Sequence, residues 1–441
     1  MLTLPILIRD LVLFLAIALV TNLVARRLSI PYTLGLVVVG LVVGLFGLTP
    51  EVQLTPDLVL YVFLPALLFE GAWNVKLDLL RKNWRVIFFL AGPGLLISVV
   101  IIAALLHFIV QLDWMTAFLL AAILSPTDPV AVLGLFRQLH VNERLSNIIE
   151  GESLFNDGVA GSLYQVFLMF VLLGVHNQSL TGWSAVGTGL LQLLIEAGGG
   201  IAFGIIAGAV ISQGLKRIDD PQIETTITLV AAYGVFWVAD TIHLSAIITV
   251  IVLGLVLGNY GRNTAMSEAT KGDVDTVWDI ASFLGNALIF LLVGVQFRSF
   301  ANIFLSNSGF ITWFVALLAV GIVLLARFFL VFILAVHSWI KWPNNLFEKG
   351  RYVPRSWRLI IFWSGLRGAL SLALALSIPL EVPARTLILV STYAVVFFTL
   401  LVQGLSIRFV LKKALPSDQQ QQGTTGPEDK GEQTEETVFS A

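Results

Sequence analysis

Long apolar runs separated by short polar stretches form the dominant pattern of this 441-residue chain. A helix that crosses the hydrocarbon core of a bilayer needs about 20 mostly apolar residues, whereas a membrane β-strand needs roughly ten alternating ones. Because the runs are long and continuous, we predict an all-α membrane protein with about 13 transmembrane helices. The predicted segments are residues 6–26, 30–47, 55–73, 86–110, 114–138, 147–174, 189–215, 220–240, 243–260, 274–297, 308–340, 356–380 and 385–412.

Composition agrees with this prediction and narrows the function. Hydrophobic residues make up 57% of the chain and charged residues 12%, against roughly 25% charged in a soluble domain. The net charge of −2 gives no electrostatic basis for nucleic-acid binding. The sequence has no Gly-rich phosphate loop followed by Lys-Ser or Lys-Thr. We therefore expect no nucleotide, no cofactor and no enzyme activity, which leaves a channel or a secondary transporter.

Basic residues predict the orientation of the chain. Of 26 Lys and Arg residues, 21 fall in one set of alternate loops, three fall in the opposite set and two lie inside segments. Because cytoplasmic loops are rich in Lys and Arg, we predict a cell-membrane protein with its N-terminus outside and its C-terminus in the cytoplasm. Residues 1–412 form the predicted transmembrane domain, and residues 413–441 a hydrophilic cytoplasmic tail that is disordered.

The fifth predicted segment is interrupted by the sequence Ser-Pro-Thr-Asp-Pro at residues 125–129. Proline lacks an N–H and clashes with the carbonyl four residues earlier. Such a break around an acid at mid-membrane is tolerated where it lines a polar cavity. The freed carbonyls, the Thr127 hydroxyl and the Asp128 carboxylate are therefore candidate oxygen ligands for a small cation. The alternative is a proline kink with Asp128 reaching the membrane surface.

The sixth predicted segment carries two acids in the sequence Gly-Glu-Ser-Leu-Phe-Asn-Asp-Gly, residues 151–158. Acids inside membrane segments are rare and usually functional. Ser153 and Asp157 are four residues apart and share one helical face, and Glu152 and Asn156 share the adjacent one. Asp157 is the candidate ion or proton ligand, with a buried structural acid as the alternative.

Two arginines lie inside predicted segments, Arg327 and Arg367. An unpaired buried charge is strongly destabilising, so each arginine needs a partner. Glu152 is the candidate for a structural ion pair, although the residues alone do not match one arginine to one acid. Two further acids, Glu196 and Asp279, fall near segment ends, where water or a partner subunit can satisfy them.

Together these residues resemble the sodium/proton antiporters of the cation/proton antiporter superfamily, specifically the electroneutral NhaP-type branch related to the eukaryotic sodium/hydrogen exchangers. The resemblance extends from about residue 10 to residue 412. The motifs that carry it, in the expected order, are Phe63-Leu64-Pro65 through Phe69-Glu70-Gly71, Thr127-Asp128-Pro129, Gly151-Glu152-Ser153 with Asn156-Asp157, Leu325-Ala326-Arg327 and Gly365-Leu366-Arg367-Gly368.

This resemblance implies thirteen helices in a dimerisation part and a six-helix core, arranged as two inverted-topology repeats with crossing broken helices, and a homodimer. The proline-broken fifth segment and the glycine-flanked twelfth segment are seven segments apart. An odd offset reverses the orientation of a segment, as an inverted repeat requires.

The resemblance also implies roles for individual residues. Asp157 is the main carboxylate and binds either the cation or the proton, while Asp128, Ser153 and Thr127 complete the sodium shell. Glu70 is similar to a family acid that lies near the ion through water.

The remaining implied roles are structural. Asn156 links two core helices, Glu152 pairs with Arg327, and Arg367 complements the carbonyl ends of the broken helices. The electrogenic branch has Asp in place of Asn156, so the resemblance implies one cation for one proton.

We therefore predict a secondary active sodium (or lithium)/proton antiporter in the lipid bilayer, working by alternating access with competition of cation and proton at Asp157. A potassium/proton antiporter on the same scaffold and a cation channel are the alternatives. An intramembrane hydrolase built on His243 and Ser245 is disfavoured, because the sequence offers no evident third member to orient the base.

Overall fold

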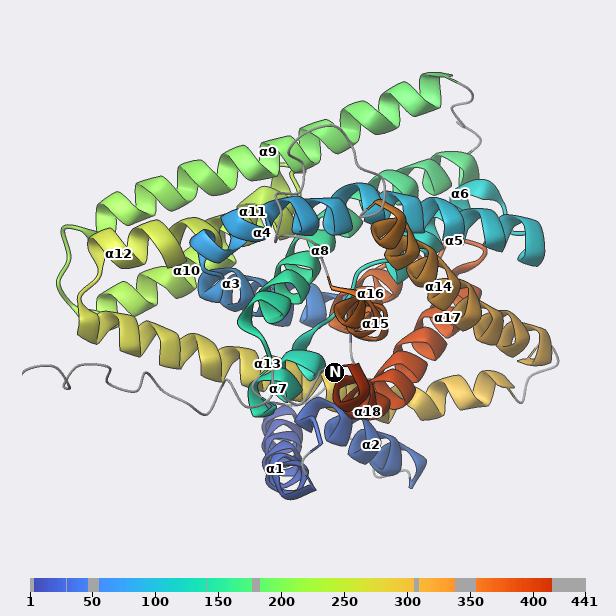
Figure 1. The fold of residues 1–441 in the computed structure, drawn as a ribbon, viewed down its shortest axis with the longest axis horizontal. Helices are drawn as coiled ribbons and strands as arrows, with labels where there is room; N and C mark the ends of the chain where they lie inside the picture. The colour runs from blue at the N-terminus through green and yellow to red at the C-terminus, as the bar shows by residue number, and fades with distance from the viewer. Residues whose placement is uncertain are drawn as a thin grey trace, which may run out of the picture.

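The computed structural model describes residues 4–28, 30–46, 55–139, 141–176, 183–304, 309–337 and 354–414. The regular elements in these ranges are all helical, as the sequence predicts, and Figure 1 shows their arrangement. Residues 415–441 of the predicted tail lie outside the described residues.

In chain order the elements are α1 (Leu4–Leu28), α2 (Tyr32–Leu45), η1 (Leu58–Phe63), α3 (Leu64–Asn74), α4 (Leu77–Phe89), η2 (Leu90–Gly94), α5 (Leu95–Val110), α6 (Trp114–Leu124), α7 (Val130–Gln138), α8 (Glu143–Val175), α9 (Trp183–Leu215), α10 (Pro221–Thr241), α11 (Ala246–Val256), η3 (Leu257–Gly261), α12 (Arg262–Ala265), α13 (Glu268–Phe304), α14 (Gly309–His337), α15 (Arg355–Trp363), α16 (Ala369–Leu376), α17 (Arg385–Phe398), η4 (Thr399–Gly404) and α18 (Leu405–Ala414).

Nine helices in the described part of the chain are long and apolar enough to cross a membrane. They correspond to α1, α4–η2–α5, α8, α9, α10, α11–η3–α12, α13, α14 and α17–η4–α18. The other four predicted segments correspond to the shorter helices α2 and η1–α3 and to the interrupted pairs α6/α7 and α15/α16. The chain is therefore a multi-pass membrane protein, and the count of thirteen crossings stays a prediction.

Two features of the long helices differ from what the apolar runs indicate. Helix α4 begins at Leu77 rather than at residue 86. Its first turns carry the exposed residues Arg81 and Lys82, and the apolar run therefore does not show where the helix begins. Pro93 lies inside an otherwise continuous helix, in the π-helical turn η2. A π-turn widens the helix at that point, which accommodates a residue that has no N–H to donate.

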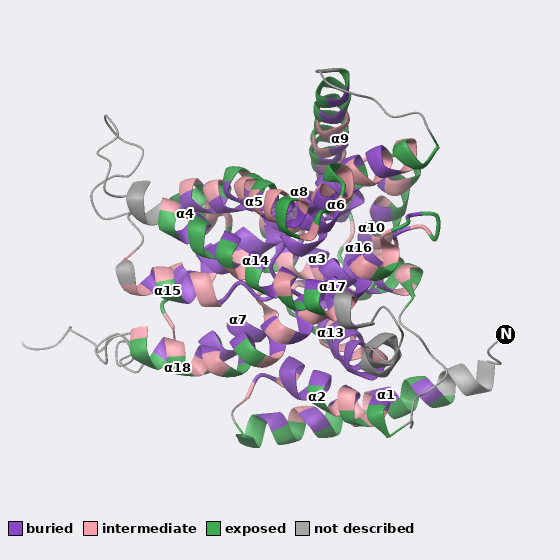
Figure 2. Ribbon diagram, turned by 90° about the vertical axis from the view of Figure 1, so that its right-hand side faces the viewer, coloured by how far each residue is buried: buried purple, intermediate pink, exposed green. Residues whose placement is uncertain are grey.

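Close helix packing depends on glycine where α2 meets α13. A β-carbon at Gly40 would overlap the Leu291 carbonyl, and one at Gly294 would overlap the Val37 carbonyl. Small residues let helix backbones approach closely in a membrane, where packing replaces the hydrophobic driving force between helices. In contrast, α9 and α1 lie at opposite edges of the molecule and present exposed apolar faces (Figure 2).

The two interrupted helices cross at the centre of the fold. The unwound residues 125–129 lie between α6 and α7, and the unwound residues 364–368 between α15 and α16. In a continuous helix the Asp128 N–H would donate to the Leu124 carbonyl. Here Asp128 donates instead to the Leu366 carbonyl (2.8 Å), and Arg367 Nε donates to the Leu124 carbonyl (3.0 Å). Each break thus satisfies main-chain groups that the other break leaves open.

Candidate cation site at the helix crossing

A cavity of about 490 Å³ reaches the crossing from one side of the protein. It extends to Arg26 and Arg137, which are exposed and belong to the set of basic residues predicted to be cytoplasmic. Its wall holds five carboxylates from different parts of the chain: Glu70 on α3, Asp128 between α6 and α7, Glu150 and Asp157 on α8, and Asp279 on α13. Acids that are far apart in the sequence therefore share one space.

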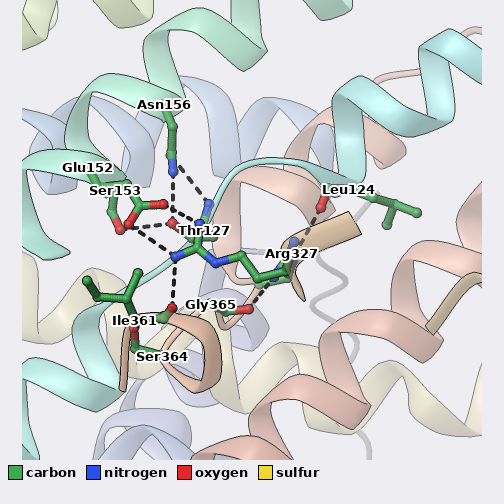
Figure 3. A network of polar contacts seen from close by, with 10 residues as sticks. Leu124, Thr127, Glu152, Ser153, Asn156, Arg327, Ile361, Ser364 and Gly365 are labelled. Carbon is green, nitrogen blue, oxygen red and sulfur yellow. Dashed lines mark hydrogen bonds and ion pairs between the residues drawn. The ribbon is translucent and has the colours of Figure 1, made fainter. Parts of the chain in front are cut away.

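Helix α8 brings Ser153 and Asp157 to the cavity one turn apart, as their spacing predicts. The Ser153 and Thr127 hydroxyls lie 3.0 Å apart in hydrogen-bonding contact. Asn156 Nδ2 donates to Thr127 Oγ1 (2.8 Å), and Asn156 Oδ1 accepts from the Thr127 N–H (3.3 Å; Figure 3). The Asn156 amide therefore holds both the side chain and the backbone of Thr127, and fixes the unwound stretch against α8.

Asp128 links α7 to the start of α16. Its Oδ1 accepts from the Val130 N–H (3.0 Å), which caps the first turn of α7, and its carboxylate also accepts from the Ala369 amide. A β-carbon at Gly368 would overlap this carboxylate. Glycine is therefore required at residue 368 for the Asp128 side chain to reach α16.

Glu152 lies on the face of α8 adjacent to Ser153 and points away from the cavity wall toward α14. Arg327 on α14 makes a two-pronged ion pair with it, through NH1 to Oε1 and through NH2 to Oε2 (3.1 Å). Arg327 NH2 also donates to the Ile361 carbonyl at the end of α15 (3.0 Å), so this ion pair joins three helices (Figure 3). Glu152 is 1% exposed and Arg327 5% exposed.

Arg367 has a different set of partners. Its side chain donates to the carbonyls of Leu124 and Gly365, and its own N–H donates to Thr399 Oγ1 (3.1 Å). These side-chain partners are main-chain oxygens at the ends of α6 and α15, the positions where broken helices leave carbonyls open. The structure therefore places Arg367 between the two breaks and Arg327 beside Glu152.

Helices α3 and α13 also line the cavity, and sequence reasoning found only part of their contribution. Glu70 accepts from Asn74 Nδ2 (2.7 Å) and from the Ser282 side chain. Asp279, Ser282 and Asn286 line the cavity from α13. Asp279 lies well inside α13, because that helix begins at Glu268, before the apolar run. The spacing of three and four residues between these polar positions was the available signal, since it marks one helical face.

Oxygen atoms dominate this site. Carboxylate and hydroxyl oxygens are hard ligands that suit small, hard cations. Among the described residues no three His, Cys, Asp or Glu side chains are grouped so that they could hold a metal ion. The lining of the cavity holds carboxylate oxygens of Asp128 and Asp157 and the neutral hydroxyl oxygens of Thr127 and Ser153.

Comparison with known proteins identifies relatives along nearly the whole chain. The family profile described as "Sodium/hydrogen exchanger, transmembrane" matches residues 12–413. The Na(+)/H(+) antiporter NhaH of Halobacillus aidingensis is 37% identical over 413 residues, which cover 92% of this chain and 97% of that protein. The Na(+)/H(+) antiporter NhaP of Pseudomonas aeruginosa is 37% identical over 78% of each chain. The solved structure of the sodium proton antiporter MjNhaP1 from Methanocaldococcus jannaschii superposes with a TM-score of 0.72 at 21% identity and covers 92% of this chain and 97% of that one.

Proposed function

The chain belongs to the sodium/hydrogen exchanger family, and from that premise we propose that it is a secondary antiporter that exchanges Na⁺ or Li⁺ for H⁺ across a cell membrane. The observation that carries the proposal is the position of Asp157. Its carboxylate lines a cavity at the crossing of two broken helices, one turn from Ser153 and beside Asp128 and Thr127. Relatives that are 37% identical over most of the chain bear the name Na(+)/H(+) antiporter.

The proposed mechanism is competition at one carboxylate. Ionised Asp157 binds the cation together with Ser153, Thr127 and Asp128, and protonated Asp157 does not bind it. Either neutral form can pass through the low-dielectric part of the protein, whereas a charged empty site pays a desolvation penalty. Because the charged, empty site does not cross, the site moves in one direction with a bound cation and returns with a bound proton. This couples the two fluxes.

The remaining site residues have supporting roles in this proposal. Asn156 holds Thr127 in place, Glu70 faces the ion across the cavity through water, and the Glu152–Arg327 pair fixes α8 against α14. Arg367 neutralises the open carbonyl ends at the crossing. None of these residues has to change its protonation state during transport.

The proposed stoichiometry is one cation for one proton. The position beside Asp157 is the neutral residue Asn156, whose amide is already engaged with Thr127. One carboxylate then exchanges one positive charge for another. In proteoliposomes, an imposed membrane potential should therefore leave the exchange rate unchanged, and exchange driven by the potential would refute the one-for-one reading.

The decisive test of the function is Asp157→Asn in proteoliposomes that carry an internal pH dye. An inward or outward Na⁺ gradient should drive proton movement with wild-type protein and not with the variant. Glu143→Gln is the matched control, because Glu143 is an exposed acid at the start of the same helix. Near-wild-type flux in Asp157→Asn would remove Asp157 from the site. Repeating the assay with Li⁺ and K⁺ distinguishes sodium from potassium exchange.

We further propose that the protein is a homodimer with its C-terminus in the cytoplasm. Support for the dimer comes from α9, which carries a row of exposed apolar side chains that includes Leu190, Leu194, Ile206 and Val210. Support for the orientation comes from the basic residues Arg26 and Arg137 at the cavity mouth. Native mass spectrometry in detergent tests the first proposal, and labelling of an introduced C-terminal cysteine in intact cells tests the second.

A further inference from the structure

Ser371 borders the same cavity, on the first turn of α16. The residue is 1% exposed, and its hydroxyl has no hydrogen-bond partner among the described residues. Buried hydroxyls are almost always paired with protein groups or water, because leaving one unpaired is costly. The hydroxyl of Ser371 therefore needs a partner that comes from the cavity.

The backbone before Ser371 differs from that of serines inside long helices. Two buried serines inside long helices donate to the carbonyl four residues earlier, Ser162 to Gly158 (3.2 Å) and Ser212 to Gly208 (2.7 Å). The corresponding carbonyl for Ser371 belongs to Arg367, which lies in the unwound stretch before α16. Unlike Ser391, whose hydroxyl also lacks a partner but lies on α17 away from the cavity lining, Ser371 combines an unpaired hydroxyl with a place in the cavity lining.

The neighbouring hydroxyls are already occupied. Thr127 Oγ1 accepts from Asn156 and is in hydrogen-bonding contact with Ser153, so each of these oxygens has less capacity left for a cation. A serine oxygen has two lone pairs. Ser371 lies on the turn of α16 that Asp128 reaches through the Ala369 amide, so its hydroxyl oxygen lines the same cavity as Asp128, Ser153 and Asp157.

We propose that Ser371 is a further oxygen ligand of the transported monovalent cation, an assignment that rests on the proposed function. Its hydroxyl coordinates the cation through oxygen and has no acidic proton to exchange at physiological pH. It therefore strengthens cation binding without affecting proton binding at Asp157. Ser371 sets how well the cation competes against the proton.

The test compares Ser371→Ala with Ser391→Ala. Ser391 is the matched control, because it is 0% exposed, its hydroxyl also lacks a partner among the described residues, and it lies on α17 away from the cavity lining. In proteoliposomes, Ser371→Ala should raise the apparent KM for Na⁺ about tenfold with an unchanged maximal rate, in line with the loss of one neutral ligand. Ser391→Ala should keep the wild-type KM.

Two further readouts separate a ligand from a structural residue. At fixed, saturating Na⁺, a tenfold loss of cation affinity moves the acid limit of transport up by about one pH unit, because Na⁺ then competes less well with H⁺. In detergent, the Na⁺ concentration that raises the melting temperature by a given amount should rise by the same factor. The melting temperature without Na⁺ should match that of Ser391→Ala.

The outcomes are distinguishable. If wild-type protein and Ser391→Ala show no Na⁺-driven proton flux, the proposed function fails, and the melting titration still tests the Ser371 assignment. If exchange is present but Ser371→Ala has the wild-type KM, pH limit and Na⁺ titration, the cation does not contact Ser371. A lower maximal rate with unchanged KM would likewise overturn the assignment and make Ser371 a structural residue.

Discussion

Replacing Glu152 with glutamine should destabilise the protein far more than it alters cation binding. Glu152 and Arg327 are both buried, their contact is two-pronged, and the only other hydrogen bond described for the Arg327 side chain goes to the Ile361 carbonyl. Glu152→Gln keeps the shape and one acceptor oxygen but leaves the arginine charge uncompensated. Removing one member of a buried ion pair costs about 3–5 kcal/mol.

This loss can be converted into a melting temperature. Unfolding entropy near the midpoint is about 2.1 cal/mol/K per residue, which for 441 residues gives roughly 0.9 kcal/mol/K. A loss of about 3–5 kcal/mol then lowers the melting temperature by about 3–6 °C. Differential scanning fluorimetry in detergent measures this shift, and a Na⁺ titration of the same samples measures cation binding.

Two controls make the measurement specific. Glu143→Gln removes an exposed acid from the same helix, where the Lys76 contact is 3.7 Å long, and should leave the melting temperature unchanged. The double variant Glu152→Gln with Arg327→Met should recover much of the loss, because it removes the stranded charge. If Glu152→Gln melts like wild type but no longer responds to Na⁺, Glu152 belongs to the cation shell and our reading of the pair is wrong.

Three further predictions concern the crossing. Gly368→Ala should abolish Na⁺-driven exchange, because a β-carbon there would overlap the Asp128 carboxylate. Gly134→Ala should behave like wild type, because Gly134 lines the same cavity and a β-carbon there would meet open space. Equal activity of the two variants would show that Asp128 is not held at α16. Asn156→Ala leaves the buried Thr127 N–H without an acceptor and should lower the free energy of unfolding by about 1–3 kcal/mol, less than Glu152→Gln. It should also raise the KM for Na⁺. An unchanged KM would show that Thr127 is not part of the cation site. If Na⁺ and H⁺ compete at Asp157, the apparent KM for Na⁺ should rise about tenfold for each unit by which the pH is lowered below the pKa of the site, at constant maximal rate. A KM that does not depend on pH would exclude a shared site.

The sequence predicts the helical segments and the proline break well, because each depends on local chemistry. Pro126 and Pro129 have to interrupt α6/α7, and the apolar runs have to be helical in a bilayer. The same reasoning could not predict that Asp128 and Leu124 find their hydrogen-bond partners on the other break. That exchange depends on two stretches more than 230 residues apart in the sequence meeting in space.

The partners of the two arginines show the same limit. Burial requires a partner for each arginine, but the type of partner is set by the fold. Arg327 meets the carboxylate of Glu152, whereas the Arg367 side chain meets the carbonyls of Leu124 and Gly365. Asp279 and Ser371 were missed for a related reason, since each becomes part of the site only when its helix packs around the cavity.

The charges at the crossing explain why the proposed exchange would bind either a cation or a proton. Glu152 and Arg327 neutralise each other in direct contact. Arg367 has the Leu124 and Gly365 carbonyls as its side-chain partners, and Asp128 accepts from the Val130 and Ala369 amides. Asp128 and Asp157 are the acids at the crossing itself, while Glu70, Glu150 and Asp279 line the wider cavity. In the proposed exchange, one Na⁺ or one H⁺ neutralises the Asp157 carboxylate, and binding both would create a charge that the low-dielectric path disfavours. On this proposal, cation and proton exclude each other at Asp157 for electrostatic reasons as well as for competition over one carboxylate.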